Sequence, residues 1–200
     1  EAPAIDVRGI TSDSRKVREG DLFVAVKGCA ADGAAYIGDA VARGAKAVVA
    51  ETGSAVPPGI PAVFVDAMRI AAPLMAGNYY GNPTRLLKVT GVTGTNGKTT
   101  ITFIMESIVK AMGKEAGVIG TINYRFKDRV VPAKNTTPGP IDLQSILAQM
   151  LGAGLDYAVM EVSSHALDQR RVDNVWFDAA VFTNITAEHL DYHLTMPNYL

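Results

Sequence analysis

The fold of this 200-residue chain is decided by residues 91–100, which are Gly91-Val92-Thr93-Gly94-Thr95-Asn96-Gly97-Lys98-Thr99-Thr100. Before them, residues 86–93 form an apolar, β-branched run that predicts a strand. After them, apolar residues recur at spacings of three and four, which predicts an amphipathic helix. We expect the apolar stripe of that helix to pack against a sheet, and its members are Ile101, Ile104, Met105, Ile108, Val109 and Met112.

A glycine-containing turn between a strand and a helix is suited to binding phosphate groups. Glycines let backbone N–H groups approach an anion, and the helix N-terminus adds unpaired donors and its positive dipole end. Lys98 can reach the β- and γ-phosphates, and the Thr99 hydroxyl can ligate Mg²⁺. The strict pattern has glycine where Val92 stands, so the loop is a variant, and a chance Gly-Lys-Thr turn is the alternative. We predict nucleotide binding by Gly94, Thr95, Asn96, Gly97, Lys98, Thr99 and Thr100.

The second half of the chain continues with alternating strand and helix patterns. Strands are expected at residues 116–122, 157–162 and 179–182, with a helix at 142–151. The last two strand runs are almost continuously apolar, as expected for strands covered on both faces. This alternation predicts an α/β fold with a doubly wound, mostly parallel sheet.

A smaller α/β unit precedes the phosphate-binding turn. Its expected strands are residues 21–26, 46–51 and 61–66, and its expected helices are residues 36–43 and 67–80. Gly81-Asn82-Pro83 then interrupts the pattern, since Gly and Pro punctuate elements. We therefore expect two domains, residues 1–83 and residues 84–200, the first small and the second built around the turn.

Composition excludes several classes of protein. The chain is 48% hydrophobic and 20% charged, with 19 Lys and Arg against 20 Asp and Glu and a net charge of −1. Such a balance argues against disorder and against a general binder of nucleic acid or anionic membranes. A single cysteine cannot form an internal disulfide, and no apolar run approaches the length of a membrane span. With no secretory signal in residues 1–9, we expect a cytoplasmic protein.

Four further segments accompany the turn. They are residues 11–23 (TSDSRKVREGDLF), 135–138 (NTTP), 160–172 (MEVSSHALDQRRV) and 183–193 (TNITAEHLDYH). Together with TGTNGKTT, they make the chain resemble the Mur ligases of peptidoglycan synthesis, and among these the branch that adds the third amino acid. The resemblance implies ATP and Mg²⁺ as cofactors. It also implies UDP-N-acetylmuramoyl-L-alanyl-D-glutamate and an amino acid as substrates, with diaminopimelate as the default and lysine as the alternative.

The resemblance also implies positions for the muramoyl substrate. Ser12 and Ser14 correspond to the uridine end, although the residues around them also suit an ordinary turn. The opposite wall of that site is implied at Cys29, Ala30 and Ala31. Contacts with the muramoyl-dipeptide are implied for Asn135, Thr136, Thr137, Ser163, Gln169 and Arg171, although the NTTP segment also suits ordinary helix capping.

Metal and catalytic positions follow the ends of predicted strands. Glu161 ends an apolar strand, where ligands of such sheets gather, and is a natural Mg²⁺ ligand beside Thr99. His189 and His193 are four residues apart, but without a third strong ligand a zinc site is rejected. By resemblance, His189 is a ligand of a second Mg²⁺. The predicted catalytic residues are Lys98, Glu161 and His189, and the predicted metal ligands are Thr99, Glu161 and His189.

Other expectations concern the extent of the protein. Mur ligases have a third domain and a carbamylated lysine, which would lie beyond Leu200, so we expect these 200 residues to turn over nothing. We also expect a monomer without nucleic-acid or membrane partners. Arg125, Lys127 and Arg129 are expected to lie on a solvated hairpin face. The alternatives are a folylpolyglutamate synthetase-like ligase and a P-loop kinase or nucleotide-binding module.

Overall fold

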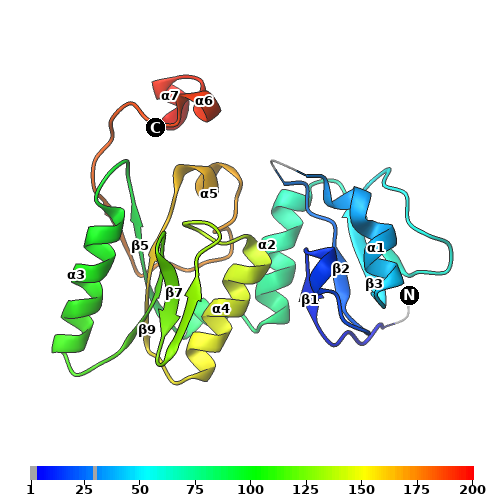
Figure 1. Cartoon of the computed structure of the whole chain (residues 1–200), viewed down its shortest axis with the longest axis horizontal. Helices are drawn as coiled ribbons and strands as arrows, with labels where there is room; N and C mark the ends of the chain where they lie inside the picture. Colours follow the sequence, from blue (N-terminus) through cyan, green and yellow to red (C-terminus); the bar gives the residue numbers. More distant parts are fainter. Residues whose placement is uncertain (1–3, 29–30) are drawn as a thin grey trace.

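The computed structural model describes residues 4–28 and 31–200 and contains two sheets on either side of helix α2 (Met68–Tyr79) (Figure 1). The first sheet is entirely parallel, in the order β1-β2-β3-β4. Its strands are β1 (Ile10–Thr11), β2 (Leu22–Val24), β3 (Ala47–Glu51) and β4 (Ala62–Val65). Helix α1 (Ile37–Ala42) and 3-10 helices at Ser14–Lys16 and Gly33–Tyr36 complete this lobe.

The second sheet has six strands in the order β10-β5-β9-β6-β7-β8. Four neighbouring strands are parallel: β10 (Ala179–Phe182), β5 (Lys88–Thr93), β9 (Tyr157–Glu161) and β6 (Ala116–Ile119). An antiparallel hairpin extends this sheet, formed by β7 (Asn123–Phe126) and β8 (Arg129–Pro132). The helices are α3 (Lys98–Ala111), α4 (Pro140–Gly152), α5 (Ser164–Asp168), α6 (Leu190–His193) and α7 (Met196–Tyr199), with a 3-10 helix at Pro83–Arg85. The predicted α/β class with a mostly parallel sheet is confirmed.

Strand register brings three chain segments to one edge of the second sheet. Val92 of β5 pairs with Glu161 of β9, and Ile119 of β6 pairs with Met160. The carboxyl ends of β5, β9 and β6 therefore lie side by side. Because ligands of open α/β sheets bind at this edge, the register places the turn after β5 and the carboxylate of Glu161 in one site.

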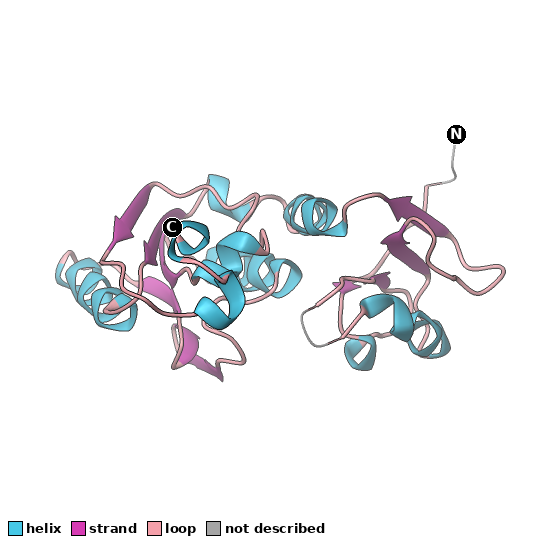
Figure 2. Ribbon diagram, turned by 90° about the horizontal axis from the view of Figure 1, so that it is seen from above, coloured by secondary structure: helices cyan, strands magenta, loops and turns pink. Residues whose placement is uncertain are grey.

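Helices α2 and α4 join the two lobes. On α4, Leu143, Leu147 and Met150 are fully buried in the core of the second sheet. Ile141, at the start of the same helix, belongs instead to a cluster with Met68 and other residues of α2 and the first sheet. Each buried side chain of this size stabilises the fold by about 1.5–3 kcal/mol. Figures 1 and 2 agree that α2 lies between the two lobes, and Figure 1 shows α4 on the second sheet at the side that faces α2.

Two packing expectations were wrong. The stripe on α3 is only partly buried: Val109 is 6% exposed, but Ile104, Ile108 and Met112 are 49%, 50% and 59% exposed. The helix packs on β5, β6 and β9, so its other flank faces solvent. Strand β10 is not covered on both faces either, since it pairs only with β5 at the sheet edge and Phe182 is 61% exposed.

Two local expectations also change. The predicted strand at residues 116–122 ends at Ile119, because the chain turns there into the β7–β8 hairpin. The basic residues of that hairpin are not all solvated. Arg125 forms an ion pair with Glu106 of α3 and stacks on the ring of Phe103 at 4.3 Å. Among the described residues, no helix combines the length and the apolar character needed to cross a bilayer.

Candidate functional site

The turn between β5 and α3 forms a loop with left-handed backbone at two glycines. Gly94 has φ +125° and Gly97 has φ +88°, a region that side chains with a Cβ rarely adopt. A Cβ on Gly94 would lie 2.3 Å from the Thr183 hydroxyl oxygen and 2.7 Å from the Asn184 carbonyl oxygen. Glycine is therefore required at position 94 both by conformation and by space.

The loop is attached to the segment that follows β10. The Thr95 N–H donates to the Asn184 carbonyl (2.9 Å), and the Asn96 N–H donates to the Asn184 side-chain oxygen (3.0 Å). The Thr183 hydroxyl donates to the Asn96 carbonyl (2.7 Å). These bonds fix the first half of the loop. Its remaining N–H groups, from residue 97 into the first turn of α3, have no hydrogen-bond partner among the described residues.

Lys98 lies at the N-terminus of α3 and turns back over the loop. Its ammonium donates to the carbonyls of Gly94 (2.7 Å) and Thr95 (2.9 Å). The helix N-cap is Gly97, which has no side chain to cap the first turn. Unpaired N–H groups, the positive end of the helix dipole and one ammonium group thus meet at one point, which is the arrangement that binds phosphate groups.

Glu161 is the buried carboxylate beside this loop, with 1% of its surface exposed. Its Oε1 accepts hydrogen bonds from the Thr99 hydroxyl (3.0 Å) and the Thr121 N–H (3.0 Å). Its Oε2 accepts one from the Thr121 hydroxyl (2.9 Å). Hydroxyl and carboxylate oxygens are the donors that Mg²⁺ prefers, so Thr99 and Glu161 fit a Mg²⁺ site.

The segment of residues 135–137 is hydrogen-bonded to Glu161 through Thr137. Thr137 is fully buried, its hydroxyl donates to the Glu161 carbonyl (2.9 Å), and it accepts from the Ser163 N–H (3.0 Å). Thr136 meets the Thr121 hydroxyl at 3.0 Å. The Asn135 carbonyl accepts from the Tyr124 hydroxyl (2.5 Å).

Ser163, Gln169 and Arg171 follow β9 on the same side. The Ser163 hydroxyl caps α5 by accepting from the Ala166 N–H (3.2 Å). The Arg171 guanidinium donates to the Gln169 side-chain oxygen (2.6 and 2.9 Å) and to the Thr137 carbonyl (2.9 Å). None of the ion pairs among the described residues includes Arg171, so its charge faces only neutral acceptors.

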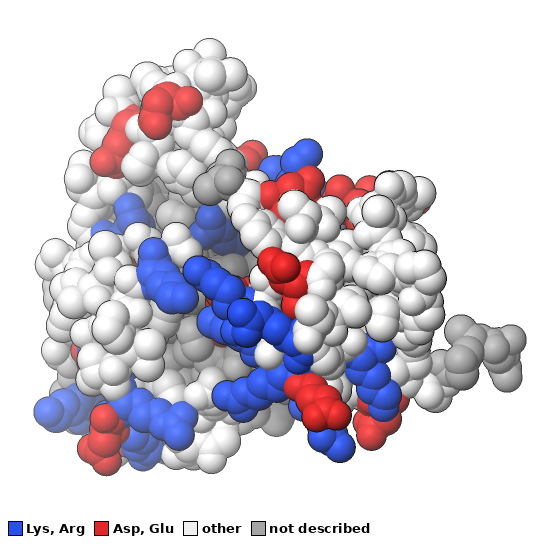
Figure 3. All heavy atoms as spheres, turned by 45° about the vertical axis from the view of Figure 1, so that its right-hand side comes forward, with Lys and Arg blue, Asp and Glu red and all other residues white. Residues whose placement is uncertain are grey.

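A cleft of about 860 Å³ opens between the two lobes. It brings together six of the predicted substrate residues, namely Ser12, Ser14, Ala31, Asn135, Gln169 and Arg171. Cys29 and Ala30, predicted for the same wall, lie outside the described residues. The cleft also contains Arg15, Lys27 and Arg69, and Figure 3 shows Lys and Arg side chains gathered along the hollow between the lobes. Lys27 and Arg69 have no ion-pair partner among the described residues, so this cleft favours an anion.

Only one of the cations in the cleft is neutralised by a neighbouring acid. Arg15 donates two hydrogen bonds to Asp13, at 2.8 and 2.9 Å. Those bonds, opposed by partial burial, lower the pKa of the Asp13 carboxyl to about 2. Asp13 is ionised at neutral pH and offsets the charge of Arg15. Lys27, Arg69 and Arg171 remain as cations without an ion-pair partner among the described residues, and Asp39 is the other acid of the lining, so the cleft keeps a net positive charge.

His189 contacts aromatic rings and one neighbouring acid. Its ring packs edge-on against His165 at 4.8 Å and against Tyr199 at 6.4 Å, and its Nε2 lies 3.9 Å from a carboxylate oxygen of Glu188. Partial burial and the neighbouring histidines lower the pKa of His165. No group of three His, Cys, Asp or Glu among the described residues is arranged to hold a metal, and Mg²⁺ prefers oxygen donors over imidazole. The role of His189 as a ligand of a second Mg²⁺ stays a prediction.

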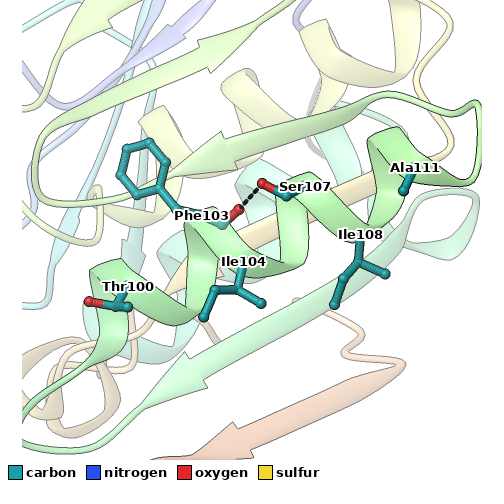
Figure 4. Close-up of a pocket in the computed structure, with 6 residues that line it drawn as sticks. All are labelled: Thr100, Phe103, Ile104, Ser107, Ile108 and Ala111. Carbon is teal, nitrogen blue, oxygen red and sulfur yellow. Dashed lines mark hydrogen bonds between the residues drawn. The ribbon is translucent and has the colours of Figure 1, made fainter.

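A second hollow lies along α3 but lacks the features of a binding site. It has a volume of about 580 Å³ and is lined from one helix only. Ile104 and Ile108 lie along it with the hydroxyls of Thr100 and Ser107, and the Ser107 hydroxyl donates to the Phe103 carbonyl at 2.9 Å (Figure 4). No polar groups converge there from another element, so we place the site at the loop and the cleft.

Sequence reasoning did not single out Thr121, Lys27 and Arg69. Thr121 follows the end of β6, and the rule that ligands gather at strand ends would have indicated it. Lys27 follows β2 and the same rule applies. Arg69 lies on α2, and nothing in its local pattern distinguishes it from a solvated helix charge.

A doubly wound parallel sheet with a glycine loop, a lysine and a buried strand-end carboxylate defines a P-loop protein of the α/β class. The family model described as Mur ligase middle domain matches residues 92–200. The model described as Mur ligase family, catalytic domain, matches residues 6–79. The chain belongs to the Mur ligase family, as the sequence motifs predicted.

Individual relatives agree with this assignment. The UDP-N-acetylmuramoyl-L-alanyl-D-glutamate–2,6-diaminopimelate ligase of Geobacter metallireducens is 49% identical over 196 residues, which are 98% of this chain and 38% of that protein. The ligase of the same name from Parabacteroides distasonis is 45% identical over 200 residues, covering 100% of this chain and 41% of that protein. The chain thus spans about two fifths of the length of the curated relatives it matches.

Solved structures show the same fold. A UDP-N-acetylmuramoyl-L-alanyl-D-glutamate–2,6-diaminopimelate ligase superposes with a TM-score of 0.82 at 29% identity, covering 96% of this chain and 39% of that chain. The MurF ligase of Thermotoga maritima in complex with ADP superposes with a TM-score of 0.65 at 26% identity, covering 96% and 41%. The likeness extends across both lobes.

Proposed function

We propose that this chain supplies the nucleotide site and the muramoyl-substrate cleft of an ATP-dependent amide ligase of peptidoglycan synthesis. The reaction joins an amino acid, for which we propose meso-diaminopimelate, to UDP-N-acetylmuramoyl-L-alanyl-D-glutamate. One observation carries the proposal. Glu161 connects the phosphate loop to the segment of residues 135–137, whose Asn135 lines the cleft: the Glu161 side chain contacts Thr99 of the loop, and its backbone contacts Thr137 of the segment.

At the nucleotide end, the free N–H groups from Gly97 into the first turn of α3 bind the phosphates of ATP. Lys98 leaves the loop carbonyls and pairs with the β- and γ-phosphates, because a charged acceptor binds an ammonium group more strongly than a carbonyl does. Thr99 and Glu161 would hold Mg²⁺. When bound, this ion neutralises phosphate charge as the γ-phosphoryl group is transferred.

At the substrate end, the cations without an ion-pair partner among the described residues (Lys27, Arg69 and Arg171) attract the negative charges of the UDP-linked substrate. We assign Lys27 and Arg69 to its diphosphate, and Ser12, Ser14 and Ala31 to the uridine end. We assign Arg171, held in place by Gln169, to a carboxylate of the dipeptide, since a guanidinium binds carboxylates in a bidentate manner.

The polar residues around Arg171 serve two purposes, hydrogen bonding and positioning. Asn135 and Thr136 provide hydrogen-bonding side chains in the segment of residues 135–137. The hydroxyls of Thr137 and Ser163 are bonded inside the protein, so we assign these two residues to positioning.

The chemistry requires no nucleophile from the protein. A carboxylate oxygen of the D-glutamyl residue attacks the γ-phosphorus, the bond to the β-phosphate oxygen breaks, and ADP leaves. The incoming amino group attacks the acyl phosphate carbon, inorganic phosphate departs with the bonding electron pair, and the amine loses a proton. Positioning and charge neutralisation by the chain's own groups account for catalysis of this type.

Several finer assignments belong to the same proposal. We propose a division at residues 83 and 84, with the first lobe serving the substrate and the second serving the nucleotide. We propose that the protein is a monomer. We propose the cytoplasm as its location, because ATP and nucleotide-linked precursors are its substrates. We propose that His189 binds a second metal ion together with a further ligand.

Thermal stability in the presence of ligands tests the proposal. A ligand that binds only the folded chain stabilises it by about 2.7 kcal/mol at 100 times its Kd. We expect UDP-N-acetylmuramoyl-L-alanyl-D-glutamate and Mg²⁺-ADP each to raise the melting temperature, and folate to leave it unchanged. A shift with folate instead of the UDP-linked compound would favour a folylpolyglutamate synthetase-like ligase. A shift with Mg²⁺-ADP alone would favour a nucleotide-binding module without the muramoyl substrate.

A further inference from the structure

Thr121 connects the nucleotide end of the site to the segment of residues 135–137. It stands two residues after the end of β6 and is exposed, whereas Glu161 beside it is buried. Its hydroxyl oxygen lies 2.9 Å from Oε2 of Glu161 and 3.0 Å from the Thr136 hydroxyl oxygen. Its N–H donates to Oε1 of the same carboxylate. One residue therefore holds both oxygens of Glu161 and also contacts the segment of residues 135–137.

The direction of these hydrogen bonds follows from the number of protons. The Thr121 hydroxyl donates to Oε2 of Glu161, so its single proton is used in that bond. The Thr121 oxygen therefore acts as the acceptor in its 3.0 Å contact with Thr136, and the Thr136 hydroxyl is the donor. A directed chain results, from the Thr136 hydroxyl through the Thr121 hydroxyl to the Glu161 carboxylate.

The same bonds limit how Glu161 can meet a cation. A carboxylate offers about four lone-pair positions. Three are occupied, two on Oε1 by Thr99 and the Thr121 N–H, and one on Oε2 by the Thr121 hydroxyl. The position that remains is on Oε2, the oxygen that Thr121 orients. Loss of the Thr121 hydroxyl would free that oxygen to rotate or to take a second contact.

We propose that Thr121 is a positioning residue that couples the two substrate sites, a role that rests on the proposed function. A cation bound at Oε2 would draw electron density from that oxygen and weaken the hydrogen bond that it accepts from Thr121. Because hydrogen bonds in a chain reinforce one another, the bond from Thr136 to Thr121 would weaken as well, and the Thr136 hydroxyl would be released to a ligand. By linkage, a muramoyl substrate that accepts from the released Thr136 hydroxyl tightens Mg²⁺-ADP by the same factor.

Thr121→Val provides a clean test, because valine keeps the shape and the backbone N–H and removes only the hydroxyl. The variant leaves the bond between Thr137 and Glu161 in place. Thr52→Val is a matched control: its hydroxyl also donates to a carboxylate, Oδ1 of Asp66, at 2.9 Å, but in the first sheet. Thr136→Val removes the other end of the chain of hydroxyls.

Calorimetry measures the coupling in the 200-residue chain. The Kd of ADP is measured in saturating Mg²⁺, with and without saturating UDP-N-acetylmuramoyl-L-alanyl-D-glutamate. We expect the UDP-linked compound to tighten ADP at least fivefold in the unmodified chain and in Thr52→Val. We expect less than twofold tightening in Thr121→Val, in Thr136→Val and in the double variant, because both substitutions break one chain of bonds.

The outcomes separate this proposal from the proposed function. If both ligands bind and Thr121→Val keeps the full coupling, or if the unmodified chain shows no coupling, the role of Thr121 is overturned and the function stands. If the two single variants lose separate shares of coupling that add in the double variant, the chain of hydroxyls is overturned. If the unmodified chain binds neither ligand, the proposed function fails, and this proposal fails with it.

Discussion

The two lobes present parallel strand ends to the same region but are equipped to bind anions by different means. After β5, the chain offers backbone N–H groups and one lysine on a loop fixed by Asn184. After β2, and on α2, it offers the long side chains of Lys27 and Arg69 beside the cleft. The first arrangement is rigid and depends on glycine, whereas the second depends on charge. Substitutions should therefore act on shape in one lobe and on affinity in the other.

The largest effect is expected at Gly94, where the loop leaves no room for a Cβ atom. Gly94→Ala adds a Cβ within 2.3–2.7 Å of Thr183 and Asn184 at φ +125°, so strain and overpacking together should cost about 2–5 kcal/mol of unfolding free energy. Gly97→Ala is the matched control, because its φ is +88° but no atom lies within 4 Å, and about 1–2 kcal/mol is expected. Urea denaturation of both variants measures the difference. Equal losses would show that the contact with residues 183 and 184 does not constrain the loop.

The next prediction separates the two means of anion binding. Lys98→Ala should weaken Mg²⁺-ADP about 10- to 100-fold, which corresponds to the loss of one charge-assisted hydrogen bond, and leave the UDP-linked substrate unchanged. Arg69→Ala should weaken the UDP-linked substrate about tenfold and leave Mg²⁺-ADP unchanged, since Arg69 lines only the cleft. Titration calorimetry with each ligand measures both. A variant that weakens both ligands equally would contradict the separation of the two sites.

The same contrast explains what the sequence could predict. The loop lies in consecutive residues, so its strand, glycines, lysine and helix were all visible in residues 91–100, and the strand-end position of Glu161 was visible too. The cleft is assembled from segments far apart in the chain, from Ser12 to Arg171. Periodicity and motifs do not report such distances, so Arg69 was missed. Family resemblance supplied Ser12, Asn135 and Arg171, which the cleft brings together.

Burial was harder to predict than element type. The α3 stripe was correct as a periodic pattern, but a pattern of period 3.6 states which residues share a face and not how much of that face a neighbour covers. Ile108 and Val109 are adjacent in the stripe, yet one is half exposed and the other is buried. The run at residues 179–182 was likewise correct as a strand, and its place at the edge was set by strand order, which depends on pairings across the whole chain.

Only the buried face of α3, the helix that follows the loop, should contribute to the free energy of unfolding. Val109→Ala removes two buried methyl-sized groups and should cost about 1.5 kcal/mol of unfolding free energy. Ile108→Ala, on the half-exposed flank, should change it by less than about 0.5 kcal/mol. Urea denaturation compares the two neighbours. A larger loss from Ile108→Ala would mean that this flank is covered in solution, which would reverse the comparison between the two faces of α3.

The smallest effect is expected in the first lobe, where Asp13 is ionised beside Arg15. The carboxyl pKa is lowered from 3.8 to about 2, chiefly by the side-chain hydrogen bonds from Arg15. A pKa that is lower in the folded state stabilises the fold above the unfolded value, and this contribution is lost as the pH falls from about 4 to about 2. It should be small, because Arg15 is largely exposed and surface ion pairs are screened. NMR titration of the Asp13 carboxyl checks this directly: in Arg15→Ala its pKa should rise toward 3.8, and a value that stays near 2 would assign the shift to the backbone instead.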